Sequence, residues 1–176
     1  LYSIDSAGSL TISNSTIATN HATTTGGGIY LYDIDRPVTI SNSTISGNTA
    51  ARIGGGIYQG STPNVTLTGS TISGNTAFGA GGLYANGPTT LVNSTVFGNS
   101  ANGGGGVVVG GPLALQSVTV SGNADLGGGM YVRQLDADVP QRREEALDVG
   151  GRWRRRGRQQ YQHVDVGARK HRRASV

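Results

Sequence analysis

One segment of eight residues recurs five times in this chain, and this repetition restricts the possible folds more than any other feature. The five copies occupy residues 10–17, 38–45, 65–72, 89–96 and 113–120, so their starts lie 28, 27, 24 and 24 residues apart. A unit of about 25 residues cannot bury its own apolar side chains, whereas stacked units share one continuous core. The repetition therefore predicts a solenoid.

Within each segment, apolar side chains alternate with serine and threonine, as in Val38, Thr39 and Ile40. Alternation with a period of two indicates strands that bury one face. The β-branched residues and glycines disfavour helix. The predicted fold class is therefore all-β, a parallel β-helix of about five coils over residues 1–132. Residues 133–176, where the repeat is absent, are expected to form a second region, a basic tail of irregular or low order.

Stacking places equivalent residues of successive coils one above another. Three aliphatic columns are therefore expected inside the solenoid: Ile12, Ile40, Leu67, Leu91 and Leu115; Ile17, Ile45, Ile72, Val96 and Val120; Ile29, Ile57, Leu83, Val107 and Met130. An asparagine follows each segment, and these side chains are expected to form a hydrogen-bonded ladder: Asn20, Asn48, Asn75, Asn99 and Asn123. Glycine precedes all of them except the first, as a corner with positive φ requires, and Thr19 takes that place in the first coil.

These repeats resemble those of right-handed parallel β-helix proteins, and especially the repeats of polymorphic outer membrane proteins. The motifs of that family are Gly-Gly-Ala-hydrophobic and Phe-x-x-Asn. Residues 55–58, Gly-Gly-Ile-Tyr, are similar to the first motif. Residues 45–48 and 96–99, Ile-Ser-Gly-Asn and Val-Phe-Gly-Asn, are similar to the second, with Ile or Val where the family often has Phe. The resemblance covers residues 1–132 and implies a right-handed helix within a larger, exported bacterial protein, located outside the cell or at the outer membrane.

The formal net charge of +4 is divided unevenly between the two regions. Residues 1–132 contain two arginines and four aspartates, a net charge of −2, and residues 133–176 contain 12 basic and 6 acidic residues, a net charge of +6. A segment such as 152–158 could be a nucleic-acid-binding arm. The preferred interpretation is that the tail is repeat sequence translated in a shifted frame. Residues 158–161, read one nucleotide later, allow Ala-Asn-Ser-Thr, which contains the Asn-Ser-Thr string of the repeats.

Two common kinds of site are not expected. The absence of cysteine excludes disulfides and thiolate metal sites. Glycine runs such as 26–28 and 54–56 recur in successive coils, whereas a phosphate-binding loop occurs once and needs a lysine, which residues 1–132 lack. We therefore expect no cofactor and no bound metal. No apolar run approaches the roughly 18 residues of a membrane span.

Asp33 and Asp35 are the best candidates for catalysis. In an extended strand, residues two apart face the same side at roughly 6 to 7 Å, a spacing that suits a Ca²⁺ ion or an acid/base pair. This alternative function is a carbohydrate-active β-helix enzyme similar to pectate lyases. A structural role is preferred, because both residues lie in the longest coil and Arg36 can balance one of them. His21 takes the place of Thr49 in the next coil and is interpreted as an exposed substitution.

The tyrosines Tyr30, Tyr58, Tyr84 and Tyr131 each follow a residue of the third column. Alternation turns them outward as a stripe that Val108 interrupts. Exposed tyrosine suits contacts with glycans or with proteins of a host or neighbouring cell, although packing on the sheet is the simpler role. The sequence thus favours a non-catalytic, adhesin-like scaffold of the cell surface or the secreted medium.

Overall fold

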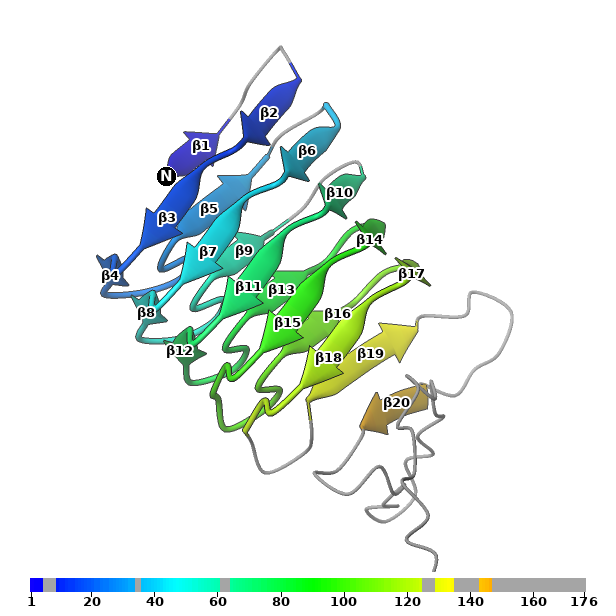
Figure 1. The fold of residues 1–176 in the computed structure, drawn as a ribbon. Coiled ribbons are helices and arrows are strands. Elements are labelled where there is room, and N and C mark those ends of the chain that lie inside the picture. Colours follow the sequence, from blue (N-terminus) through cyan, green and yellow to red (C-terminus); the bar gives the residue numbers. More distant parts are fainter. Residues whose placement is uncertain (5–8, 34–35, 61–63, 125–128, 135–142, 147–176) are drawn as a thin grey trace, which may run out of the picture.

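The computed structural model describes residues 1–4, 9–33, 36–60, 64–124, 129–134 and 143–146. Within these residues the chain forms strands and turns and no helix. Successive coils stack along one axis, so strands far apart in sequence lie side by side (Figure 1). The architecture is the all-β parallel solenoid that the repeats predict.

Three sheets run the length of the solenoid, and a fourth, shorter sheet spans three coils. The first sheet has the order β1 (Tyr2–Ile4), β5 (Ile29–Tyr32), β9 (Ile57–Gln59), β13 (Leu83–Ala85), β16 (Val107–Val109), β19 (Met130–Gln134), β20 (Arg143–Ala146). The second has the order β17 (Leu113–Gln116), β14 (Thr89–Val92), β10 (Val65–Thr68), β6 (Val38–Ser41), β2 (Leu10–Ser13). The third has the order β18 (Thr119–Ser121), β15 (Thr95–Phe97), β11 (Thr71–Ser73), β7 (Thr44–Ser46), β3 (Thr16–Ala18). The fourth has the order β12 (Thr76–Ala77), β8 (Thr49–Ala50), β4 (His21–Ala22).

Strands of neighbouring coils pair in parallel with equivalent residues opposite each other, as Leu67 pairs with Ile40 on one side and Leu91 on the other. The one antiparallel pair among the described strands joins β19 to β20, which lies within the basic tail. The number of coils differs slightly from the prediction. Five repeats suggest about five coils, but the solenoid makes about four turns, because five stacked strands are separated by four steps.

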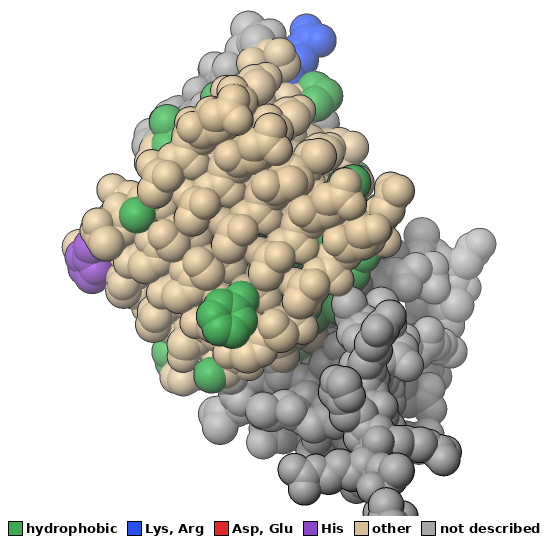
Figure 2. All heavy atoms as spheres, viewed as in Figure 1, with side chains coloured by type: hydrophobic (Ala, Val, Ile, Leu, Met, Phe, Trp, Pro, Cys, Tyr) green, Lys and Arg blue, Asp and Glu red, His purple; other side chains and the backbone are tan. Residues whose placement is uncertain are grey.

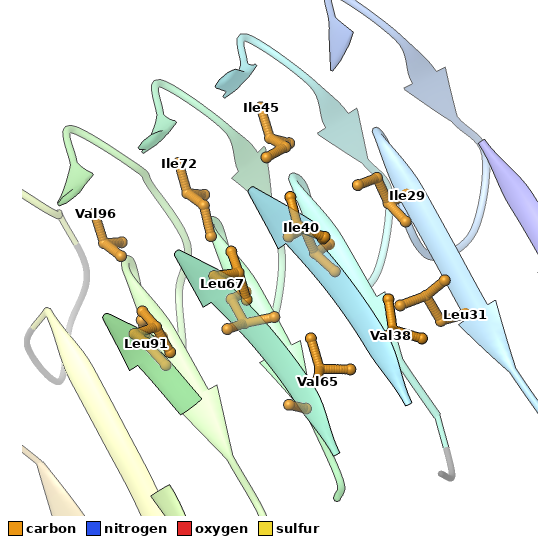
Figure 3. Packing of buried hydrophobic residues seen from close by; sticks show 14 of the residues in the cluster. Ile29, Leu31, Val38, Ile40, Ile45, Val65, Leu67, Ile72, Leu91 and Val96 are labelled. Atoms are coloured by element: carbon orange, nitrogen blue, oxygen red, sulfur yellow. The ribbon is translucent and has the colours of Figure 1, made fainter. Parts of the chain in front are cut away.

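The three predicted aliphatic columns line the interior (Figure 3). Their central members, such as Ile40, Ile45 and Leu83, have no exposed surface. Three of their members in the outer coils are only partly buried: Ile17, Leu115 and Val120. Burial of apolar surface contributes about 25 cal/mol per Å², so the central coils contribute most of the hydrophobic stabilisation.

The interior also contains residues outside the three predicted columns. Leu31, Gln59, Ala85 and Val109 follow the third column by two positions and are fully buried. Val38, Val65 and Thr89 form a further column at the start of the second sheet. Gln59 brings an amide into an otherwise apolar column, between Leu31 and Ala85.

Asparagine side chains connect the coils at the corner after the third sheet. Asn75 donates from its backbone nitrogen and from Nδ2 to Oδ1 of Asn99, both at 2.9 Å, and Nδ2 also donates to the carbonyl of Ile45. The same pattern joins Asn48 to Asn75 and Asn99 to Asn123. Each buried amide therefore reaches the coils on both sides. The glycines before these asparagines have φ between 61° and 63°, and Thr19 has a φ of 56°.

Serines form a second ladder, which the sequence analysis missed. At the corner between the second and third sheets, the backbone nitrogen of Ser43 donates to Oγ of Ser70, and that of Ser70 donates to Oγ of Ser94. These three serines are buried. Serine is usually exposed, so its burial is not expected from composition. The sequence feature that could have predicted this ladder is a serine at the same position of four consecutive repeats, beginning with Ser15.

Candidate functional site

The outer face of the first sheet carries the most distinctive side chains of the solenoid. In β5, β9 and β13, the first residue points into the core and the tyrosine that follows points outward. The parallel register places Tyr58 opposite both Tyr30 and Tyr84. Three tyrosines of three successive coils therefore stand in one row, which we call the tyrosine ladder: Tyr30, Tyr58 and Tyr84.

The rings of the tyrosine ladder stack on one another. The ring centroids of Tyr30 and Tyr58 are 5.1 Å apart with an interplanar angle of 10°, and those of Tyr58 and Tyr84 are 5.4 Å apart with an angle of 5°. Parallel rings in van der Waals contact have planes closer than this, so the rings are offset along their planes. Tyr58 therefore has a ring stacked against each of its faces, and all three side chains remain partly exposed.

A second outward column lies beside the tyrosine ladder, two residues further along each strand. It contains Tyr32, Gly60 and Asn86. A Cβ atom at Gly60 would lie 2.6 Å from Cδ2 of Tyr32 and 3.1 Å from Cε1 of Tyr58, so the ring of Tyr32 occupies the space above this glycine. Tyr32 also stacks on Tyr30, at 6.2 Å and 23°. Asn86 connects to the preceding coil by donating from Nδ2 to the carbonyl of Gly60, at 2.8 Å.

The aromatic surroundings affect the ionisation of the central tyrosine. Burial raises the pKa of Tyr58 above its usual 10.0, and the neighbouring phenols of Tyr84, Tyr30 and Tyr32 raise it further. A raised pKa keeps the Tyr58 hydroxyl protonated, so it remains a hydrogen-bond donor. Strands β5, β9, β13 and β16 contain no charged residue. The site is therefore an aromatic and neutral hydrogen-bonding surface.

Val108 interrupts the row of tyrosines, as the sequence predicts. It lies opposite Tyr84 in β13 and opposite Tyr131 in β19. Tyr131 is partly buried and shares the register position of the tyrosine ladder, one coil beyond Val108. The predicted stripe therefore consists of three contiguous rings, one gap and a fourth tyrosine.

The candidate catalytic pair is described only in part. Asp33 follows β5, is exposed and has a φ of 54°, a left-handed conformation that aspartate tolerates better than most residues. Asp35 lies outside the described residues, so the spacing of the two carboxylates is not part of this structure. Arg36 is exposed. Among the described residues, no group of three or more His, Cys, Asp or Glu side chains could hold a metal ion.

The remaining predicted residues lie away from the tyrosine ladder. His21 is exposed on β4 of the fourth sheet, opposite Thr49. Asn48, Asn75, Asn99 and Asn123 are buried, so their amides are occupied in the structure and do not face solvent. The basic segment 152–158 lies outside the described residues. No helix in the described part of the chain has the length and apolar character needed to cross a membrane.

A family model described as a right-handed β-helix region matches residues 2–133, well over half of the chain. The match begins at β1 and ends within β19. No curated protein and no solved structure matches the chain.

Proposed function

The chain belongs to the right-handed β-helix family, and we propose that it is a non-catalytic scaffold segment of a bacterial cell-surface or secreted protein. In this proposal the solenoid is an adhesin-like module of the kind built from polymorphic outer membrane protein repeats. It extends away from its attachment point and presents its outer faces to glycans or to proteins of neighbouring cells.

The observation that carries this proposal is the repetition of the outer surface from coil to coil. One outward column of the third sheet is threonine in all five strands: Thr16, Thr44, Thr71, Thr95 and Thr119. An active site is a unique arrangement of unlike groups, whereas a repeated surface presents the same groups many times. This pattern supports a scaffold with a periodic binding surface.

The chemistry of the outer surface agrees with this proposal. Figure 2 shows the face of the second and third sheets almost entirely as uncharged polar side chains and backbone, with no acidic side chain among the described residues on it. The exposed Phe97 of the third sheet and His21 of the neighbouring fourth sheet are among the exceptions to the small hydroxyl side chains. General acid/base catalysis needs positioned groups that titrate. The small hydroxyl side chains on this face do not titrate near neutral pH, but they can form hydrogen bonds with a bound partner.

The experiment that tests the proposal separates binding from turnover. The full chain is incubated with a panel of neutral and acidic polysaccharides, with and without Ca²⁺, and new reducing ends and unsaturated products are measured. We expect no product at any protein concentration. Product formation that is abolished by Asp33→Asn would replace the scaffold with the carbohydrate-active enzyme that uses Asp33 and Asp35.

A separate experiment tests the proposed location of the protein at the cell surface or in the medium. Antibody against the solenoid should label intact cells of the source organism, or the protein should accumulate in the medium. Labelling that appears only after lysis would contradict a surface or secreted scaffold.

A further inference from the structure

The tyrosine ladder has a spacing that restricts what can bind along it. Its ring centroids repeat at 5.1 and 5.4 Å, which follows the coil spacing of about 4.8 Å in a β-solenoid. A partner that places one unit against each ring must advance by this distance per unit, parallel to the solenoid axis. An extended peptide repeats on one face every two residues, at roughly 6.6 to 6.8 Å, and falls out of step with the rings.

Successive sugars of an extended β-1,4-linked glucan ribbon advance by nearly the coil spacing, with alternate sugars turned over, so each ring can meet one sugar. Such a chain is uncharged, as are the strands that carry the tyrosine ladder. Its ring C–H groups can pack on the exposed parts of the aromatic rings, and its hydroxyls can pair with phenol hydroxyls. An α-linked glucan of the same composition coils, so its sugars do not match the ladder.

The side chains beside the tyrosine ladder extend the same surface. Tyr32 is 46% exposed and forms an aromatic wall at one end, where its ring covers Gly60. Asn86 is exposed two residues after Tyr84 and offers an amide oxygen to a sugar hydroxyl.

Building on the proposed scaffold function, we infer that the tyrosine ladder binds a neutral, extended, β-linked polysaccharide that lies parallel to the solenoid axis with one sugar per coil. The ligand class is the same for plant, microbial and matrix glucans of this geometry. Contact through Tyr30, Tyr58 and Tyr84 makes affinity depend on chain length, because each further sugar engages a further ring.

The test uses the full chain and three soluble probes: cellohexaose, cellobiose and maltohexaose. Isothermal titration should detect cellohexaose binding at least about tenfold tighter than either of the other two. Maltohexaose has the same sugar composition as cellohexaose, so it controls for non-specific contact with glucose. Equal affinity for cellohexaose and maltohexaose, or no binding of cellohexaose, overturns the inference.

Two substitutions test the location of the site. Tyr58→Ala removes the central ring and should weaken cellohexaose binding by about fivefold or more, with circular dichroism to verify that the solenoid is intact. Val108→Tyr fills the gap between Tyr84 and Tyr131 and should strengthen binding by severalfold, because it makes the row continuous. The matched control is Thr95→Tyr, which adds a tyrosine to the third sheet and should leave affinity unchanged.

The outcomes distinguish this inference from the scaffold proposal on which it rests. Unchanged affinity in Val108→Tyr, or an equal gain in Thr95→Tyr, contradicts the ladder as the binding site and leaves a non-catalytic scaffold in place. Cleavage of cellohexaose during the titration contradicts the scaffold proposal itself.

Discussion

Oδ1 of Asn75 accepts two hydrogen bonds from Asn48, one from its backbone nitrogen and one from Nδ2, both at 2.9 Å. Both residues are fully buried. An unsatisfied buried donor costs about 1–3 kcal/mol, so the corner of each coil depends on the asparagine of the next. This relationship fixes the coil spacing on which the tyrosine ladder is built.

Replacing the central asparagine should be costly. Asn75→Ala removes the acceptor of Asn48 and the donor to the Ile45 carbonyl, and we expect the free energy of unfolding to fall by about 3 kcal/mol. Asn20→Ala is the matched control, because Asn20 is exposed at the end of the same ladder, and its loss should cost about 1 kcal/mol. Chemical denaturation measures both values. If both substitutions lower the free energy of unfolding equally, burial of the asparagine is not what makes its hydrogen bonds important.

The corner of the first coil should respond favourably to glycine. Thr19 has a φ of 56°, and a β-branched residue in this region is strained. Thr19→Gly should therefore stabilise the chain by about 1 kcal/mol, whereas Gly74→Thr at the equivalent corner should destabilise it by a similar amount or more. Thermal unfolding gives the sign of each change. A melting temperature of Thr19→Gly below that of the wild type would contradict backbone strain at Thr19.

Substitutions at two glycines distinguish the cost of steric crowding from the cost of backbone strain. A Cβ at Gly56 would lie 2.6 Å from the carbonyl oxygen of Gly82, whereas a Cβ at Gly98 would meet nothing within 4 Å. Gly56→Ala should cost about 3 kcal/mol, because backbone must move. Gly98→Ala should cost only about 1 kcal/mol, because its φ of 63° disfavours alanine. The difference in denaturation midpoints measures the crowding, and the reverse order would contradict the tight packing of the coils.

High pH should weaken the solenoid through Tyr58. Its pKa is raised in the folded state by burial and by Tyr84, Tyr30 and Tyr32, so folding favours the protonated phenol. The stabilising effect is complete below the unfolded pKa of 10.0 and is lost as the pH rises through the higher folded value. Tyr58→Phe should therefore lose less stability than the wild type above about pH 10. The measurement is the free energy of unfolding of both proteins as a function of pH. If the two proteins lose stability equally above about pH 10, the raised pKa of Tyr58 is contradicted.

Much of the fold follows from the spacing of a few residues. The intervals between Thr44, Thr71 and Thr95 set the coils in register, and Gly74 before Asn75 indicates the corner with positive φ. The burial of Ser70 was not predicted, because it lies at a corner outside the strands, and serine is usually exposed. The burial of Gln59 was not predicted either, although it lies two residues after Ile57 on the inward face, because glutamine is usually exposed.

The site was predictable only in part. Alternation places Tyr58 outward, but the offset stacking of its ring on Tyr30 and Tyr84 depends on three-dimensional packing. The covering of Gly60 by Tyr32 likewise depends on a contact between different coils.

The central claim is that stacked coils, joined by internal ladders, create the periodic outer surface. Hydrogen–deuterium exchange followed by mass spectrometry tests it most directly, because each coil has its own backbone hydrogen bonds to its neighbours. We expect the slowest exchange in β10, β11 and β13 and in the glycine segment around Gly55, with faster exchange toward β2 and β17. Fast exchange throughout the glycine segments, with no maximum in the central coils, would contradict the account.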